Sequence, residues 1–240
     1  MVKLRIGVIG IPGKWSTETL ADAVEKQTGF RLVVDMADIS LDLEKNVLVS
    51  GSVNLCELDG IIVKKISAVY SPTTLDRLEL LRVAEQAGVR VFSPALSMLR
   101  LIDRLSCTVT LRNAGIPMPE TRVTEDITVA MNTVRDFGSA VFKPLYSTKA
   151  RGMTIIDADQ DAVNMERAVR DFSADNQMMY IQRKIKRPGR DLGRVFLAGS
   201  YLGTYARVPQ GEAWNTTIHS GGHYAAHTPT DEVIELAHRA

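Results

Sequence analysis

The sequence predicts an α/β protein of two domains. In the first part of the chain, short apolar runs alternate with a helical pattern, which is typical of parallel strands joined by crossover helices. In the second part, two neighbouring strand-like runs are separated by a hairpin-sized gap, which indicates an α+β domain with antiparallel pairs. A chain of 240 residues is long enough to bury an apolar core in each domain.

The N-terminal domain is expected over residues 1–94. Its expected strands are 4–9, 31–34, 60–63 and 89–92, and its expected helices are 17–26 and 74–87. Ser16 is expected to cap the first helix, because a serine hydroxyl just before a helix can accept a hydrogen bond from a backbone N–H of the first turn.

The C-terminal domain is expected over residues 95–240. A helix over 96–113 leads to a linker near residues 114–121, where two prolines and a glycine favour an extended chain. The other expected elements are helices at 129–136, 162–172 and 231–240 and strands at 140–145, 153–156, 178–185, 194–198 and 202–208.

The composition is that of a globular protein without an overall electrostatic bias. Hydrophobic residues make up 45% of the chain, charged residues 24%, and the formal net charge is +1. We therefore expect neither nucleic acid nor a membrane as a partner. Only Cys56 and Cys107 are cysteines, which argues against a disulfide scaffold. With no signal-peptide pattern and no apolar run near the roughly 20 residues of a membrane span, a cytoplasmic location is expected.

The glycine-rich turn from Gly7 to Lys14 could cradle a phosphate, because glycines before a helix expose backbone N–H groups. However, a phosphate-binding P-loop needs a glycine at Val8 and a serine or threonine at Trp15. The spacing therefore favours a tight strand-to-helix turn, with a nucleotide site as the alternative.

Lys143 lies inside an apolar strand and is followed by a small, polar loop that ends at Gly152. An ammonium on a buried strand needs a partner, because an unpaired buried charge is costly. A nucleotide phosphate is one such partner, and the loop could offer it hydroxyl and N–H donors. The alternative is a solvated lysine on an edge strand.

A basic cluster follows the strand at 178–185. It comprises Arg183, Lys184, Lys186, Arg187, Arg190 and Arg194, against the single acid Asp191. Such local charge suits a polyanion or a carboxylate substrate, and the alternative is a solvated charged edge.

From Phe92 onward, the chain resembles the ATP-grasp ligases, in particular the RimK-type branch, which is similar to glutathione synthetases. The resemblance rests on the segments AVFKPLYSTKARGM, YIQRKIK and GTYARVPQGEAWNTTIHSGG and on the pair Asp103-Arg104. It implies a Rossmann-like pre-ATP-grasp domain followed by an α+β ATP-grasp domain. Arg183 stands where the family usually has an acid, Thr217 where it has an asparagine, and Asp191 and Arg194 are one residue further apart than usual.

The resemblance implies a role for each of several residues. ATP would be bound by Arg104, Lys143, Ser147, Thr148, Gly152, Gln182, Arg183, Lys184, Ile185 and Asp191. Arg207 and Arg194 would be catalytic and stabilise developing negative charge. The substrate would contact Thr217, His219, Gly221 and Gly222.

The implied reaction is an ATP-dependent ligation of a carboxylate to an amine through an acyl phosphate. The expected substrates are a small-molecule or peptide carboxylate and a glutamate-like amino acid, and assembly into a homo-oligomer stays open. The alternative from another class is an ATP-binding module that does not ligate.

The resemblance also implies Mg²⁺, held by an acid on a late strand and a following Glu-x-Asn. The sequence runs only to the helix at 231–240, so we expect no metal ligands in it and a C-terminally incomplete ATP-grasp domain. Asp231, Glu232 and Glu235 are expected to be solvated. A second metal hypothesis is zinc held by His219, His223 and His227, which recur every fourth residue. Gly221 and Gly222 interrupt a helix there and favour a glycine loop instead.

Overall fold

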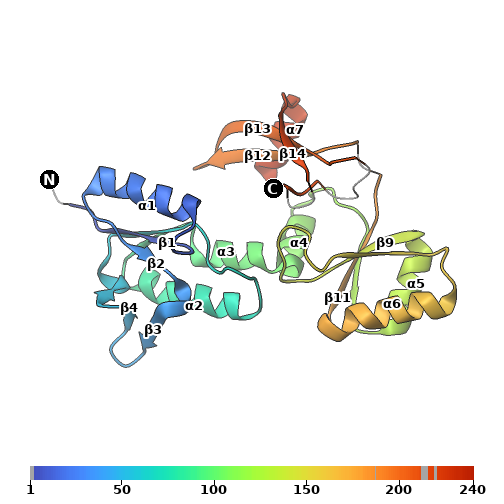
Figure 1. Ribbon diagram of the computed structural model, residues 1–240, viewed down its shortest axis with the longest axis horizontal. Helices are drawn as coiled ribbons and strands as arrows, with labels where there is room; N and C mark the ends of the chain where they lie inside the picture. The colour runs from blue at the N-terminus through green and yellow to red at the C-terminus, as the bar shows by residue number, and fades with distance from the viewer. Residues whose placement is uncertain (1–2, 187, 212–215, 219–220) are drawn as a thin grey trace. The chain divides into compact units, whose positions relative to one another are not determined.

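A computed structural model describes residues 3–186, 188–211, 216–218 and 221–240 (Figure 1). The chain divides into two compact units, Met1–Asp103 and Arg104–Ala240, which we call the N-terminal and C-terminal units. Each unit is described by itself.

The N-terminal unit is built on a parallel sheet, as the alternating pattern predicted. Its four strands run in the order β2-β1-β6-β7, and each neighbouring pair is parallel. The strands are β1 (Ile6–Ile9), β2 (Val33–Val34), β6 (Gly60–Val63) and β7 (Arg90–Phe92). Because successive side chains of a strand point to opposite faces, these apolar runs supply both faces of the sheet.

Two helices cover the two faces of this sheet (Figure 1). Helix α1 (Trp15–Thr28) packs on the face that carries Val8, and α2 (Thr73–Gln86) packs on the face that carries Ile9. Ser16 lies inside α1, so its predicted capping role is wrong: the N-cap is Lys14, without a side-chain cap. The Glu18 carboxylate instead accepts the Gly13 N–H at 2.7 Å. That acid occupies the start of α1, where an anionic ligand would otherwise bind.

A small antiparallel sheet between β2 and β6 was not predicted. It consists of β3 (Ile39–Asp42), β4 (Val47–Ser50) and β5 (Val53–Asn54), flanked by the 3₁₀ helices η1 (Met36–Asp38) and η2 (Leu55–Glu57). Its strands are short and mostly half-exposed, which gives a weak periodic signal. Leu48 and Leu55 are fully buried and join the sheet to the core of the unit.

The helix predicted over 96–113 is two helices, α3 (Ala95–Ile102) and α4 (Arg104–Asn113). Asp103 has an extended backbone, with φ −75° and ψ 111°, and breaks the helix at the junction of the two units. Ala95 and Leu99 pack into the core of the N-terminal unit, while α4 belongs to the C-terminal unit. Helical spacing alone does not show that the two halves pack in different units.

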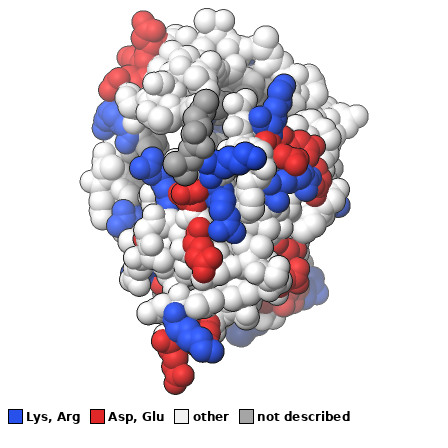
Figure 2. All heavy atoms as spheres, turned by 90° about the vertical axis from the view of Figure 1, so that its left-hand side faces the viewer, with Lys and Arg blue, Asp and Glu red and all other residues white. Residues whose placement is uncertain are grey.

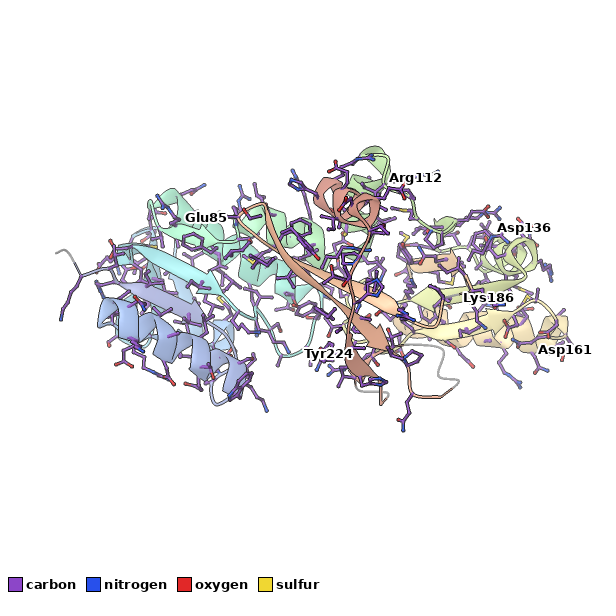
Figure 3. The ribbon with its side chains drawn as sticks, turned by 90° about the horizontal axis from the view of Figure 1, so that it is seen from above. Glu85, Arg112, Asp136, Asp161, Lys186 and Tyr224 are labelled. Carbon is purple, nitrogen blue, oxygen red and sulfur yellow. The ribbon has the colours of Figure 1, made fainter. Side chains whose placement is uncertain are left out.

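The first sheet of the C-terminal unit is antiparallel, with strand order β10-β9-β11-β8. Its strands are β8 (Thr121–Thr124), β9 (Ser139–Lys143), β10 (Thr154–Asp157) and β11 (Met179–Arg183). Helices α5 (Ile127–Phe137) and α6 (Ala162–Asp175) cover one face around the buried Phe142 and Ile181. Asp161, labelled in Figure 3, precedes α6 and caps it by accepting the Asn164 N–H at 2.9 Å. Strand β8 was not predicted.

The second sheet of this unit has the order β12-β13-β14 and is also antiparallel. Strands β12 (Asp191–Leu197) and β13 (Ser200–Val208) form the predicted hairpin, with β14 (His223–Ala226) beside β13. Helix α7 (Asp231–Arg239) follows, and the ring of its His238 stacks on Phe196 with centroids 5.7 Å apart. His223 lies in a strand, so a helical row of zinc-binding histidines is wrong. His219 lies outside the described residues.

The two charge types are mixed on the surface. Figure 2 shows one face of the molecule, where basic and acidic side chains are interspersed. Within the described ranges, no helix combines the length and the apolar character that a membrane crossing requires.

Candidate nucleotide-binding site

The candidate site begins on the face of the first C-terminal sheet that α5 and α6 leave open. Phe142 and Ile181 point to these helices and are fully buried. Since side chains alternate along a strand, Lys143, Tyr180 and Gln182 project from the opposite face. The register pairs Tyr180 with Lys143 across β11 and β9 and so brings the two strands' polar side chains together.

Lys143 has an amide as its polar partner. Its Nζ donates to Oε1 of Gln182 at 2.5 Å. The amide nitrogen of Gln182 donates to Thr121 Oγ1 at 2.9 Å and to Tyr180 Oη at 3.3 Å, and this hydroxyl also contacts Thr108 Oγ1 at 2.9 Å. These bonds turn the carbonyl of Gln182 towards the ammonium, so the network fixes the position of Lys143.

Arg104 places a second positive charge beside Lys143. Its Nε donates to the carbonyl of Pro144 at 2.9 Å and its Nη2 to Ser147 Oγ at 3.1 Å. Burial lowers the pKa of Arg104. Burial, together with the charge of Arg104, lowers the pKa of Lys143 to about 8. Within the described residues, no carboxylate lies at ion-pair distance from either cation, so an anion bound here would gain both charges.

The loop at 147–152 folds back towards β9. Ala150 and Gly152 both have positive φ, 58° and 66°. A Cβ atom on Gly152 would lie 3.0 Å from Cγ of Pro144, so the loop approaches the end of β9 closely. The carbonyl of Thr148 accepts a hydrogen bond from a backbone N–H three residues further on, at 3.3 Å. A compact, glycine-containing turn therefore stands beside the two cations.

Arg183, one of the predicted ATP-binding residues, has its guanidinium bound to other groups of the protein. Its Nε and Nη2 donate to Oε2 of Glu120 at 3.1 and 2.6 Å, and its Nη1 donates to the carbonyl of Phe137 at 3.1 Å. It also lies over the Phe137 ring, 4.7 Å from the centroid. Glu120 thus neutralises the arginine that stands in place of the usual acid. No local signal could identify it, because it is 63 residues away in the sequence.

Asp191 and Arg207 form an ion pair across β12 and β13. Nε and Nη2 of Arg207 donate to the two carboxylate oxygens of Asp191 at 2.9 and 3.2 Å, and Thr216 Oγ1 donates to Oδ2 at 2.6 Å. Hydrogen bonding to Asp191 raises the pKa of Arg207. Arg194 is three residues beyond Asp191, so it projects from the other face of the sheet, where its Nε is buried without a partner among the described residues. The structure therefore unites Asp191 with Arg207 and not with Arg194.

Gly221 and Gly222 close a tight turn after Thr217. Gly221 has φ +81°, and the Gly222 N–H donates to the carbonyl of Thr217 at 3.1 Å. A Cβ atom on Gly222 would lie 2.6 Å from the carbonyl oxygen of Thr216, closer than real Cβ atoms approach. The turn therefore requires glycine at this position, as the predicted glycine loop implied.

A cavity of about 680 Å³ lies between the two sheets of the C-terminal unit. Lys143, Gln182 and Asp191 line it, whereas its lining does not include Arg104, Ser147, Thr148, Gly152, Arg194, Arg207, Gly221 or Gly222. Its described lining includes four basic side chains and one acidic side chain. It is lined by Pro119, Val141, Lys143, Ala150, Met153, Gln182, Arg183, Lys184, Ile185, Lys186, Gly189, Asp191, Pro209, Gly211, Thr216 and Thr217. Its size and charge suit a polar, anionic small molecule. We call it the inter-sheet cavity. One of its basic residues, Lys186, lies on the segment that follows β11 (Figure 3).

Residues 110–240 match the family of the prokaryotic glutathione synthetase ATP-grasp domain. The match spans more than half of the chain, so the chain belongs to this ATP-grasp family, and the curated relatives are ligases.

The chain is similar in sequence or in structure to several known proteins, of which we describe three. The chain is 24% identical to tetrahydromethanopterin:alpha-L-glutamate ligase of Methanosarcina acetivorans, over 98% of this chain and 78% of that protein. The structure resembles a RimK domain ATP-grasp protein from Sphaerobacter thermophilus, with a TM-score of 0.70 and 21% identity over 98% of this chain and 80% of that chain. It also resembles the ATP-grasp ligase PsnB in complex with minimal precursor, Mg and ADP, with a TM-score of 0.68 and 18% identity over 100% and 81% of the two chains. These structural likenesses support the fold.

Proposed function

We propose that this protein binds ATP in the inter-sheet cavity and joins a glutamate-like amino acid to a carboxylate through an acyl phosphate. The observation that carries the proposal is the pair of cations, Lys143 and Arg104, without a carboxylate partner among the described residues. Membership in the ATP-grasp family supports ATP as the anion. The name of the Methanosarcina acetivorans relative, an alpha-L-glutamate ligase, supports glutamate as the amine substrate.

The ATP phosphates would lie against Lys143, Arg104 and the loop at 147–152. A bound phosphate favours the charged form of Lys143 and so reverses the effect of burial on its pKa. Hydroxyl and backbone N–H groups of the loop can donate to phosphate oxygens. The adenine would lie against Lys184 and Ile185, which line the same cavity.

The chemistry would proceed in two transfers. A carboxylate oxygen attacks the γ-phosphorus, the bond from this phosphorus to the bridging oxygen breaks, and ADP leaves. The amine then attacks the acyl carbon, loses a proton and expels phosphate, which forms the C–N bond. Both steps concentrate negative charge, which the guanidinium of Arg207 would stabilise. Asp191, which also accepts a hydrogen bond from Thr216, would hold this guanidinium in place. Thr217, Gly221 and Gly222 would contact the substrate, and so would His219, which lies outside the described residues.

Magnesium is the usual companion of ATP, and the related PsnB structure contains Mg and ADP. Hard cations prefer several oxygen ligands. Over the described ranges there is no group of three or more His, Cys, Asp or Glu side chains that could hold a metal ion. Asp191, the one acid in the described lining of the cavity, is already paired with Arg207. These described residues do not form a magnesium site.

The test measures ATP binding and turnover separately. Calorimetry should show that Lys143→Met weakens ATP binding at least about tenfold, because a buried charge-assisted contact is lost. Lys26→Met, which changes an exposed lysine of α1, should bind ATP like the wild type. Unchanged ATP affinity in a folded Lys143→Met variant would refute the site. Release of ADP that depends on an added amino acid supports ligation, whereas ATP binding without turnover supports the non-catalytic module.

A further inference from the structure

A second cavity of the C-terminal unit lies along the free edge of its first sheet. It has a volume of about 490 Å³, which is within the range of small-molecule sites. Its lining comes from α4, the segment that follows α4, strand β8 and the end of α5. We call it the edge cavity. Among its lining residues, only Pro119 also lines the inter-sheet cavity, so the two cavities are separate places on the unit.

Strand β8 offers unpaired backbone groups to the edge cavity. It is the last strand in the order β10-β9-β11-β8. The Arg183 N–H donates to the carbonyl of Glu120 at 2.8 Å, so every second residue from Glu120 turns its backbone groups to β11. Thr121 and Val123, which lie between, turn theirs to the free edge, and both line the cavity. No other backbone group of the described residues bonds to them there.

The walls of the edge cavity are apolar. Helix α4 contributes Leu105 and Val109, one turn apart, the following segment contributes Met118, and α5 contributes Phe137. Val109 is 49% exposed, so part of this apolar surface is open to solvent. Burying it against a ligand would favour binding, because apolar surface is then removed from water.

Arg112 supplies the only charge in this lining that no described residue neutralises. Glu120 accepts a hydrogen bond from the guanidinium of Arg183 at 2.6 Å, and Arg122 donates to Asp136 at 2.6 Å. Arg112 lies in the last turn of α4 (Figure 3), and no carboxylate of the described residues lies at ion-pair distance from it. The cavity therefore combines an apolar body with one free positive charge.

Hydrogen bonds hold the walls of the edge cavity in place. Thr108 Oγ1 of α4 lies 2.9 Å from the hydroxyl oxygen of Tyr180, and Thr121 Oγ1 of β8 accepts the side-chain amide of Gln182 at 2.9 Å. Both bonds fasten a wall to the central strand β11. The cavity is thus formed before any ligand arrives, which lowers the entropy cost of binding.

We propose that the edge cavity binds a small monocarboxylate with an apolar body, which places its carboxylate at Arg112 and its apolar part between α4 and Phe137. The free N–H groups of Thr121 and Val123 can donate to an oxygen of the same ligand. A cation would be repelled by Arg112, a neutral ligand would leave it unpaired, and a polar anion would leave the apolar walls uncovered. The proposal goes beyond ATP binding, because none of the residues assigned to ATP lines this cavity.

The test uses two probes with the same body and different charge, 4-phenylbutyrate and 4-phenylbutanamide. NMR titration of the full chain should show saturable binding of 4-phenylbutyrate, with shifts of the Thr121 and Val123 amide signals, and binding of the amide at least about fivefold weaker. Arg112→Gln should weaken 4-phenylbutyrate to about the affinity of the amide and leave the amide unchanged. Val109→Ala should weaken both probes about threefold, because less apolar surface is buried.

Both substituted side chains are exposed, so both variants should fold. Arg170, which forms an exposed ion pair with Glu166 on α6, gives the matched control: Arg170→Gln should bind both probes like the wild type. Four results would overturn the proposal: no saturable binding of 4-phenylbutyrate, equal affinity for the two probes, wild-type affinity in Arg112→Gln, or displacement of the probe by ATP. ATP affinity should be unchanged in both variants, so failure here and failure of the ATP site are separate results.

Discussion

Replacing Lys143 should stabilise the protein at neutral pH while removing its ATP contact. Burial and the nearby Arg104 lower the pKa of Lys143 from 10.5 to about 8. Each pKa unit corresponds to about 1.36 kcal/mol. Keeping this lysine charged in the folded state therefore costs up to about 3 kcal/mol at about pH 7. Lys143→Met keeps a flexible chain of similar length without the charge, and we expect it to raise the free energy of unfolding by about 1–3 kcal/mol.

The pH dependence of this difference tests its cause. Between about pH 8 and pH 10.5, the unfolded lysine still holds its proton while the folded one has lost it, so the stability of the wild type rises with pH. The variant lacks this group, and its other groups titrate as in the wild type. The stability advantage of Lys143→Met should therefore shrink by about 2 kcal/mol between about pH 7 and pH 9.5.

Urea unfolding of both proteins at the two pH values measures this change. NMR titration of the lysine side chains gives the pKa of Lys143 directly. A Lys143 pKa near the ordinary value of 10.5 would refute the reasoning, and so would a stability difference that is the same at both pH values. A destabilised variant at neutral pH would show that Lys143 contributes more through packing than its charge costs.

Two further variants test the remaining parts of the site. Gly222→Ala should destabilise the protein by about 1–3 kcal/mol, because the new Cβ atom would lie 2.6 Å from the carbonyl oxygen of Thr216. An unchanged midpoint of thermal unfolding would contradict this close contact between residue 222 and the backbone of Thr216. Asp191→Asn should lower the free energy of unfolding by less than about 1 kcal/mol, since the side chains of Asp191 and Arg207 are 38% and 39% exposed. It should nevertheless reduce turnover, because the guanidinium of Arg207 is then free to move. A large loss of stability, or turnover equal to that of the wild type, would contradict a positioning role for Asp191.

Much of the fold follows from local sequence patterns. The strands at 60–63 and 140–145 and the helices at 74–87 and 162–172 correspond to β6, β9, α2 and α6. Their apolar residues repeat with the period of the element, so each segment carries its own signal. The short strands β3 to β5 lack that signal because few of their residues are buried, and only their neighbours stabilise them.

The candidate site likewise has a part that the sequence predicted and a part that it did not. Lys143 on an apolar strand before a glycine-containing loop was visible in the sequence, because the conflict between its charge and its apolar neighbours is local. The partners of Lys143 and Arg183 were not visible. Gln182 is 39 residues from Lys143, and Glu120 is 63 residues from Arg183. Which side chains meet over such distances depends on strand register, which the periodicity of a single strand does not contain.

The sequence by itself thus determined most of the longer helices and strands, the ATP-grasp resemblance and the lysine at the centre of the site. The tertiary structure decided how the charges are paired. It set Gln182 against Lys143, joined Asp191 to Arg207, and left Arg112 without a partner of opposite charge among the described residues. The physical reason is that propensity and apolar periodicity act between near neighbours, whereas electrostatic pairing depends on the three-dimensional positions of residues far apart in the chain.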